Sequence, residues 1–429
     1  MDNNFISFPI TDFKRTKQQV LSWANQFNTC CFLDNHQYQF NHHSYECIAG
    51  VGAADYIELK AGNALNQLQQ FQQKHSGWLF GHLGYDLKNE VEELVSAHPD
   101  HINFPDLYFF SPQTVLLFNQ DELFIAAENA ERANQVFAEI TAMDTRKEIT
   151  QKNQILFQQR FSEQAYIDTV EKLRGHILRG DCYEINFCQE FFANHAEIDP
   201  VHVYQLLSRI SPTPFAAFYK VNDNYLLCAS PERYLKKEGN TIISQPIKGT
   251  SSRNAANADA DEINKELLYR SSKDRAENVM VVDLVRNDLS RLCIEGSVQV
   301  DELFGIYSFP QVHQMISTVS GTLQPNLLFT DIIKKTFPMG SMTGAPKKKV
   351  MELIEKYENV KRGIFSGAVG YIKPGGDFDF NVVIRSIMYN QYNQYLSYLV
   401  GSGITFYSKA DEEYEECLLK AAAIKAVFV

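Results

Sequence analysis

The chain has 429 residues, of which 45% are hydrophobic and 12% aromatic, so it can bury a sizeable core in one large domain or in two to three average ones. Its formal net charge of -12 argues against a nucleic-acid backbone as partner, and no polybasic segment suits a membrane surface. No apolar run approaches the roughly 18 residues of a membrane span, and the first residues lack the basic and apolar regions of a secretory signal.

The eight cysteines form no CxxC pair, and no cluster of cysteine and histidine has the spacing of a zinc site. Cys30 and Cys31 are neighbours whose side chains point to opposite faces of an extended segment, so they cannot bridge each other. We therefore expect reduced thiols and a cytoplasmic protein.

The first third of the chain, residues 1–143, is predicted to be a strand-rich segment that packs on the core. Apolar runs at 104–110 and 114–118 predict two strands separated by a turn, and 130–143 is predicted to be an amphipathic helix. Residues 144–160, polar in their first part, are the predicted linker. The rest, 161–429, is the predicted main domain, whose first helix begins after Ser162 and ends at Gly180.

The second half of the chain combines strands with a few long helices. Residue spacing predicts helices at 262–285, 345–357 and 411–426, and apolar runs predict strands at 367–372, 380–387 and 395–400. The strands follow one another through hairpin-like turns, without the regular strand–helix alternation of a parallel sheet. The sequence therefore predicts an α+β fold with a largely antiparallel sheet.

Two of these helices carry acidic faces. Glu413 and Glu416 lie three residues apart on the last helix, and Asp274 and Glu277 share a stripe on the helix at 262–285. Carboxylates that converge from two helices, without cysteine or histidine, are the hard oxygen ligands that Mg²⁺ prefers. The alternative is that both are solvated helix faces.

Lys248 lies near the end of a predicted strand, 244–250, where reacting groups are often presented. In partly apolar surroundings the pKa of a lysine can be lowered, so that its neutral amine acts as a nucleophile. For a lone lysine, a solvated strand edge is the more common situation.

Other segments are candidates for binding an anion or a substrate. The turn at 340–347 opens a helix and suits a carboxylate, although Pro346 removes a backbone donor and the glycine spacing excludes a P-loop. The glycines at 401 and 403 would let backbone N–H groups approach a ligand, or simply form a tight turn. Arg385 could fork onto a carboxylate, and His313 could hydrogen-bond a substrate hydroxyl or be a satisfied core residue.

Eight motifs follow one another between residues 180 and 421. They are GDCYEINF at 180–187, SPER at 230–233, PIKGT at 246–250, KDRAENVMVVDLVRNDLSRL at 273–292, GSMTGAPK at 340–347, GAVGY at 367–371, GSGI at 401–404 and EYEECLLKA at 413–421. In this order they resemble the chorismate-utilising enzymes, which include anthranilate, isochorismate, salicylate and aminodeoxychorismate synthases. The likeness is looser before residue 160, where GWLFGHLGYD at 77–86 is its clearest part.

The resemblance implies a large composite antiparallel β-sandwich with surrounding helices, with chorismate as substrate and Mg²⁺ as cofactor. It implies that Glu277 and Glu416 are direct metal ligands, with Glu413 and Asp274 in the same site, partly through water. Glu232 resembles the general acid that protonates the departing hydroxyl, a role that needs a raised pKa.

The resemblance also implies a set of substrate-binding residues. These are Thr250, His313, Thr343, Tyr371, Arg385, Gly401, Gly403 and Lys420. Tyr371 and Arg385 resemble the residues that bind the enolpyruvyl carboxylate, and His313 resembles the group that faces the ring.

Within the family, Lys248 distinguishes one chemistry from the others. Water-using members have a lysine in place of Glu184, and anthranilate synthases usually have an alanine in place of Lys248. The lysine resembles that of the synthases in which it attacks ring C2 as the C4 hydroxyl leaves, before ammonia attacks C4 and expels it. We therefore expect 4-amino-4-deoxychorismate, on the folate branch; the alternative is amination at C2 with loss of pyruvate. Amine-using members usually have glutamine at position 184, so the role of this carboxylate is open.

The resemblance implies partners as well. No Gly-x-Cys-x-Gly elbow surrounds any cysteine, so ammonia is expected from a separate glutamine amidotransferase subunit. The family's N-terminal sheet contains a tryptophan pocket, which would form here at 31–35 and 211–215.

Overall fold

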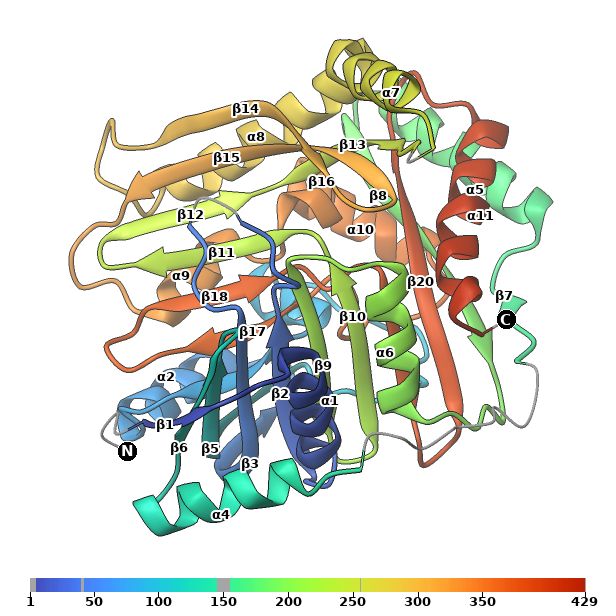
Figure 1. Ribbon diagram of the computed structural model, residues 1–429. Helices are drawn as coiled ribbons and strands as arrows, with labels where there is room; N and C mark the ends of the chain where they lie inside the picture. The colour runs from blue at the N-terminus through green and yellow to red at the C-terminus, as the bar shows by residue number, and fades with distance from the viewer. Residues whose placement is uncertain (1–4, 40–41, 145–154, 255, 429) are drawn as a thin grey trace.

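The computed structural model describes residues 5–39, 42–144, 155–254 and 256–428, and within them twenty strands join through antiparallel pairings into one large sheet (Figure 1). Two long strands, β3 (Cys47–Leu59) and β5 (Leu107–Phe118), pair along their whole length and join the two arms of the sheet. The two arms bring together segments that lie far apart in the sequence.

The first arm leads outward from β3. Its strands, in order, are β2 (Thr29–Asp34), β9 (Phe215–Val221), β10 (Asn224–Ser230), β19 (Ser386–Asn390), β20 (Tyr395–Ile404) and β8 (Glu184–Ala193). Two short strands, β7 (Gln158–Gln159) and β16 (Gly344–Ala345), pair with β8.

The second arm leads outward from β5. Its strands, in order, are β4 (Leu79–Leu83), β17 (Ala368–Ile372), β18 (Phe378–Asn381), β11 (Arg233–Glu238), β12 (Thr241–Gln245) and β15 (Val312–Thr322). β13 (Ile247–Ser252) and β14 (Gln299–Ser308) also pair with β15, while β6 (Glu122–Ala126) joins β5 to β1 (Ile6–Pro9).

Helices surround this sheet (Figure 1). On the second arm, α7 (Ala258–Arg270) and α8 (Ser272–Ser290) contact β13 and β15. On the first arm, α5 (Glu163–Leu178) and α11 (Ala410–Lys425) contact β20. On the same arm, α6 (Pro200–Ile210) contacts β10 and α10 (Lys347–Tyr357) contacts β8. Nearer the N-terminal strands lie α1 (Phe13–Ala24) against α4 (Ala130–Thr141), α2 (Ala64–Lys74) against α9 (Phe329–Thr336), and the short α3 (Lys88–Val91). No helix within the described ranges is both long and apolar enough to cross a membrane.

The α+β class and the antiparallel sheet are confirmed, as are the helices at the predicted positions of α4, α5, α10 and α11. Ser162 caps α5 by accepting a hydrogen bond from the Ala165 N–H, and Gly180 ends that segment with a φ of 83°. These helices were predictable because their caps and apolar spacing are local features of the sequence.

Several predicted elements differ from the structure, among them the strand at 244–250, which is the end of β12 and the start of β13. The two strands at 104–110 and 114–118 are the single strand β5, in which Pro112 lies between the stretches that pair with β4 and β6. The missing N–H of this proline therefore removes little from the ladder of hydrogen bonds. The predicted strand at 380–387 ends at Asn381 and resumes at Ser386, so Arg385 lies in a connection with a φ of 50°.

The predicted helix at 262–285 is two helices, α7 and α8, which meet at Ser271. The backbone of Ser271 is extended, and its hydroxyl accepts a hydrogen bond from the Asp274 N–H. Asp274 and Glu277 consequently lie in the first two turns of a new helix. This break places both carboxylates at a helix N-terminus, where negative charge is favoured.

The division at 1–143, 144–160 and 161–429 stays a prediction, and residues 145–154 of the predicted linker lie outside the described residues. Strands from the N-terminal segment pair directly with strands of the main one, as β2 does with β9 and β4 with β17. Buried side chains from both segments also share the same clusters of the core.

Candidate active site

Lys248 lies in a bulge of β13. Ile247 pairs with Ile316 and Thr250 with Gln314, so two residues of β13 lie where β15 has one. Gly249 in this bulge has a φ of 95°, a conformation that L side chains rarely adopt. The bulge turns Lys248 out of the regular alternation of the strand and directs its ammonium toward Glu184 on β8 of the other arm.

The ammonium of Lys248 is held by carboxylates. Its Nζ lies 2.5 Å from Glu184 Oε1, and only 12% of the lysine side chain is exposed. Burial by itself would lower the pKa of Lys248, but the charges of Glu184, Glu277 and Glu232 outweigh it and raise the pKa above the ordinary value. The lowered pKa that the sequence suggested is therefore wrong for the free protein, in which Lys248 is a cation.

Glu184 is fixed by backbone on two sides. It is the first residue of β8 and pairs with Ala345 of β16, while the next residue, Ile185, pairs with Ile404 of β20. A side chain at Gly403 would place a Cβ 2.8 Å from Lys248 Nζ and 2.9 Å from Glu184 Oε1, so only glycine fits beside the pair. Gly403 is thus part of the site because it makes room for the Lys248–Glu184 contact.

Glu232 and Arg385 lie on the same side of the site. Glu232 is 4% exposed, and burial raises its pKa to about 7, although the charges of Lys248 and Arg385 oppose this shift. A carboxyl group with this pKa holds a proton for much of the time near neutral pH, as a general acid requires. Burial also lowers the pKa of Arg385 to about 10, against the favourable charge of Glu232, so the guanidinium stays cationic.

The four acidic residues on the two helices lie around one lysine. Glu413 of α11 is 3.6 Å from the Nζ of Lys273, and the charges of Glu413, Glu277, Glu416 and Asp274 outweigh burial and raise the pKa of Lys273. Burial raises the pKa of Glu277 to about 7 and also raises that of Glu413. The predicted convergence of α8 and α11 is thus observed, with Lys273 as the cation among the carboxylates.

This donor set fits a hard divalent cation. In the part of the chain that the structure describes, Glu277 Oε1 is buried without a hydrogen-bond partner, which a bound metal ion would supply. The carboxylates of the two helices are spaced more widely than the ligands of a closed metal site. Among the described residues, the only set of three or more Asp, Glu, His or Cys side chains with ligand atoms all within 4.8 Å of one another is Asp34, Glu46 and Cys47. In that other cluster, both oxygens of Asp34 already accept hydrogen bonds from Lys17.

Of the predicted substrate-binding residues, Gly403 lies against the Lys248–Glu184 pair, while Gly401 and Thr343 contact the following residues of β8. The buried Thr343 accepts a hydrogen bond on its carbonyl from the Asn186 N–H, two residues after Glu184. The Nζ of Lys420 donates to the Gly401 carbonyl at 3.0 Å and also contacts Glu416 at 2.7 Å. Thr250 is exposed at the far side of the bulge. The turn at 340–347 is not an open anion cradle, because its β16 residues pair with β8.

The structure places His313 differently from its predicted role. Its Nδ1 lies 2.8 Å from Ser308 Oγ and its Nε2 lies 3.2 Å from Asp261 Oδ1, so both ring nitrogens are engaged near α7. The alternative of a satisfied core histidine is therefore the observed one. The next residue, Gln314, belongs to the other face of β15, and its buried Oε1 has no hydrogen-bond partner within the described ranges.

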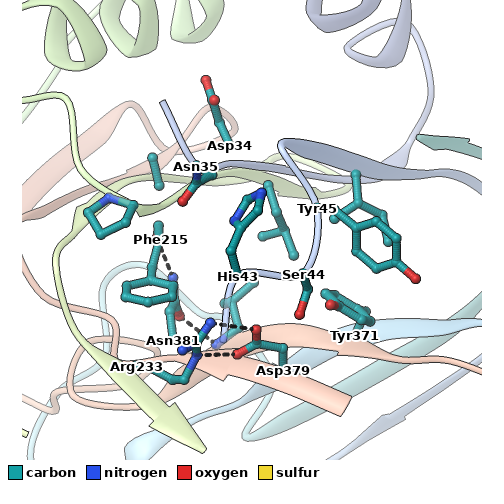
Figure 2. A pocket seen from close by; sticks show the side chains of 15 residues that line it. Asp34, Asn35, His43, Ser44, Tyr45, Phe215, Arg233, Tyr371, Asp379 and Asn381 are labelled. Carbon is teal, nitrogen blue, oxygen red and sulfur yellow. Dashed lines mark hydrogen bonds and ion pairs between the residues drawn. The ribbon is translucent and has the colours of Figure 1, made fainter. Parts of the chain in front are cut away.

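Tyr371 also lies outside this site. It lines a second cavity, where its ring is 5.8 Å from those of Tyr45 and Trp78 (Figure 2). Successive residues of a strand face opposite sides, and the motif that contains Tyr371 does not reveal which side faces the substrate. We therefore do not retain Tyr371 as a ligand of the enolpyruvyl carboxylate.

The second cavity lies where the tryptophan pocket was expected. Leu33, Asp34 and Asn35 of the first segment and Pro214 and Phe215 of the second line it. In Figure 2, the paired Arg233 and Asp379 lie on one side of the cavity and Tyr45 and Tyr371 on another. The cavity thus combines a charged pair with aromatic side chains.

The sequence reasoning missed one residue of the site and left another open. Lys273 belongs to a motif that was recognised, but only the convergence of α8 and α11 shows it among four carboxylates. Glu184 was noticed as a departure from the family pattern, and the structure gives it a partner, Lys248.

Comparisons with known proteins agree with this architecture. The protein family described as chorismate binding enzyme matches residues 18–426. An anthranilate synthase component I-like protein of Synechocystis is 33% identical over 82% of this chain and 72% of its own length. Aminodeoxychorismate synthase component 1 of Salmonella typhimurium is also 33% identical, over 81% of this chain and 76% of its own. The crystal structure of anthranilate synthase component I from Streptococcus pneumoniae superposes with a TM-score of 0.78 at 27% identity, covering 91% of this chain and 94% of that one.

Proposed function

Because this chain belongs to the chorismate-binding enzyme family, we propose that it aminates chorismate at C4 to give 4-amino-4-deoxychorismate. The observation that carries the proposal is Lys248, an amine that a bulge directs into a group of carboxylates beside a carboxyl group with a pKa of about 7. The name of the Salmonella relative supports the same chemistry.

In the proposed reaction, the neutral amine of Lys248 forms a bond to ring C2. The two ring double bonds shift, the C4–O bond breaks, and Glu232 gives its proton to the oxygen so that water leaves. Ammonia then bonds to C4, the double bonds shift back, and Lys248 departs from C2 as a neutral amine. Glu232 regains its proton from solvent before the next cycle.

The charges of the substrate match those of the surrounding side chains. Chorismate has two carboxylates, and we assign one to the guanidinium of Arg385. We assign the ring carboxylate to the region of Thr343, Gly401, Gly403 and Lys420, close to the acidic helices. Thr250 is assigned to the edge of the same site.

The acidic helices are the proposed Mg²⁺ site, with Glu277 and Glu416 as ligands and Glu413 and Asp274 beside them. A bound Mg²⁺ would offset the repulsion between these carboxylates and the ring carboxylate. Exhaustive chelation is expected to remove turnover and Mg²⁺ to restore it. Turnover that survives chelation would exclude the assignment.

Amination at C2 with loss of pyruvate is the second candidate function. The names of the Synechocystis and Streptococcus proteins favour it. Lys248 argues against it, because the anthranilate reaction has no need for an amine side chain at C2.

Product analysis distinguishes the two functions. Purified protein is incubated with chorismate, Mg²⁺ and ammonium at about pH 8.5, where some ammonia is free, and the products are separated and weighed by mass spectrometry. A product that an added lyase converts to 4-aminobenzoate supports C4 amination. Fluorescent anthranilate with released pyruvate would establish the alternative.

A separate glutamine amidotransferase is the proposed source of ammonia. The chain alone is expected to use ammonium and to ignore glutamine, because no Gly-x-Cys-x-Gly elbow is present. Product formed from glutamine by the purified chain would contradict this partner.

The second cavity is proposed to bind tryptophan. Its aromatic side chains suit an indole ring, and the charged groups of Arg233 and Asp379 suit an α-amino acid. Calorimetric titration with tryptophan is expected to show binding at micromolar concentration. A titration without heat, with no change in thermal stability, would remove this ligand.

A further inference from the structure

The proposed reaction needs a neutral amine, whereas Lys248 is a cation in the free protein. Three carboxylates raise its pKa, so solvent alone would leave very little of the amine free near neutral pH. The proton must therefore leave Lys248 for a nearby acceptor before the bond to C2 forms.

Glu184 is the proton acceptor that contacts Lys248. Its Oε1 lies 2.5 Å from Lys248 Nζ and already accepts a hydrogen bond from it, so the proton has only to move along that bond. No hydrogen bond or ion pair within the described ranges joins Lys248 to Glu232 or Glu277, which act on it only through their charges. Glu232 is in addition needed in its protonated form.

One oxygen of the Glu184 carboxylate is available to take a proton. Its second oxygen, Oε2, is buried and has no hydrogen-bond partner in the part of the chain that the structure describes. Only 2% of the side chain is exposed, so water does not compete freely for it. A protonated Glu184 could rotate the new O–H away and leave the amine free to attack. An unpaired buried oxygen is costly in a purely structural ion pair but useful in a proton acceptor.

The positions of Glu184 and Lys248 are also fixed by the surrounding backbone. β16 and β20 fix the backbone at the start of β8, the bulge of β13 fixes Lys248, and Gly403 lies against both side chains. Preorganisation of this kind is what proton transfer between two fixed groups requires.

We propose that Glu184 is the catalytic base that takes a proton from Lys248 and returns it at the end of the cycle. In the first step the N–H bond of the Lys248 ammonium breaks and an O–H bond forms on Glu184, so the pair becomes amine and carboxylic acid. After ammonia has displaced the lysine from C2, the Lys248 amine takes the proton back. The pair begins and ends each cycle as a salt bridge, with no net proton consumed. This inference rests on the proposed function.

The test uses the full chain with chorismate, Mg²⁺ and ammonium and compares Glu184→Gln with Glu184→Asp. Glutamine keeps the size and can hydrogen-bond but accepts no proton, whereas aspartate keeps the base. At pH 7.5 we expect Glu184→Gln to lose about 10²- to 10⁴-fold in kcat, the usual contribution of general-base catalysis. Its dissociation constant for chorismate should change by only a few-fold, and Glu184→Asp should keep a substantial part of the wild-type rate.

The pH dependence of the rate distinguishes a catalytic base at position 184 from a residue that only fills space. In Glu184→Gln the proton must go to hydroxide, so at equal concentrations of free ammonia the rate should rise with pH relative to that of the wild type. The other charged groups that face Lys248, namely Glu232 before β11, Glu277 of α8 and Glu416 of α11, are the same in both variants. Differences between the two profiles therefore report on Glu184.

Failure of the proposed function can be distinguished from failure of the proposed role of Glu184. If the wild type yields anthranilate, or mass spectrometry finds no aminodeoxychorismate, the proposed function fails. If the wild type aminates C4 and Glu184→Gln keeps the wild-type rate and pH profile, the proposed function stands and Glu184 is not the base. Equal losses in the glutamine and aspartate variants, with parallel pH profiles, would likewise reduce Glu184 to a structural role.

Discussion

At the scale of single residues, the site depends on one amine and two carboxyl groups whose protonation differs. Lys248 is cationic because carboxylates outweigh its burial, while Glu232 holds its proton because burial outweighs its cationic neighbours. Glu184 contacts the lysine and accepts a hydrogen bond from its ammonium. In the proposed reaction, these residues are the acid and the nucleophile.

Replacing Lys248 should separate binding from chemistry. We expect Lys248→Ala to lose at least about 10³-fold in C4 amination, because no other side chain takes the place of a covalent nucleophile. Chorismate should still bind within a few-fold of the wild-type affinity, as measured by calorimetry. Lys74→Ala, an exposed lysine paired with Asp55, is the matched control and should be unaffected. Wild-type turnover in Lys248→Ala would show that the lysine is not the nucleophile.

Glu232→Gln should be more stable than the wild type above neutral pH. Folding raises the pKa of Glu232 from 4.5 to about 7, so the folded state loses stability as pH rises between these values. Glutamine has no proton to lose, and we expect a gain of up to about 3 kcal/mol in the free energy of unfolding at pH 8.

Denaturant unfolding across pH measures this difference. The gain should vanish below about pH 4.5, where the carboxyl group is protonated in both the folded and the unfolded state. C4 amination should be lost at every pH, since glutamine cannot protonate the leaving hydroxyl. A difference in stability that is independent of pH would mean that Glu232 does not carry a raised pKa.

At the scale of elements, the break between α7 and α8 is the feature that the site needs most. One continuous helix through 262–285 would carry Asp274 and Glu277 in mid-helix, whereas the cap at Ser271 starts a new helix just before them. The bulge of β13 acts in the same way on Lys248. Both irregularities redirect side chains that regular elements would point elsewhere.

The capping hydroxyl at Ser271 should therefore affect metal binding. Ser271→Ala and Ser162→Ala each remove an N-cap, from α8 and α5, and each should cost about 1 kcal/mol of stability. Only Ser271→Ala should weaken Mg²⁺ binding, since only α8 carries proposed ligands. Calorimetric titration with Mg²⁺ checks this. Equal Mg²⁺ affinity in the two variants would mean that the cap does not position Asp274 and Glu277.

At the scale of the whole molecule, the site lies between two arms of the sheet that are joined through β3 and β5. Lys248 comes from the second arm and Glu184 from the first, so the Lys248–Glu184 contact exists only when the complete sheet has formed. The N-terminal strands are thus required for the site although they contribute none of its reacting groups.

The burial of all eight cysteines gives a test of the whole fold. Each is free and buried, and burial raises the pKa of thiols such as Cys30 and Cys228, to about 12 and about 11. A thiol reagent should therefore react with no cysteine in the native protein and with eight after unfolding. Rapid reaction of one thiol under native conditions would reveal an opening of the core.

The sequence by itself determined the family, the α+β class and the capped helices, and its motifs predicted Lys248, Glu232, Arg385 and Gly403 as site residues. Motifs and caps are local patterns, so they can be identified without knowing what lies opposite. The face of a strand on which a side chain lies, and the residues that it contacts, are not local properties of the sequence. Tyr371 was placed in the site because it belongs to a motif, and His313 because it resembles the group that faces the ring. The pairing of strands turned both away from the site.

Only the tertiary structure decided that Lys248 is a cation in contact with Glu184, and that Lys273 lies among four acidic groups. Each fact depends on the distance between side chains from different elements, which sequence spacing does not contain. Charge interactions depend steeply on distance and burial, so the pKa of a lysine cannot be read from its neighbours in the chain. The packing of the two arms thus set the chemistry of residues that the sequence had already identified.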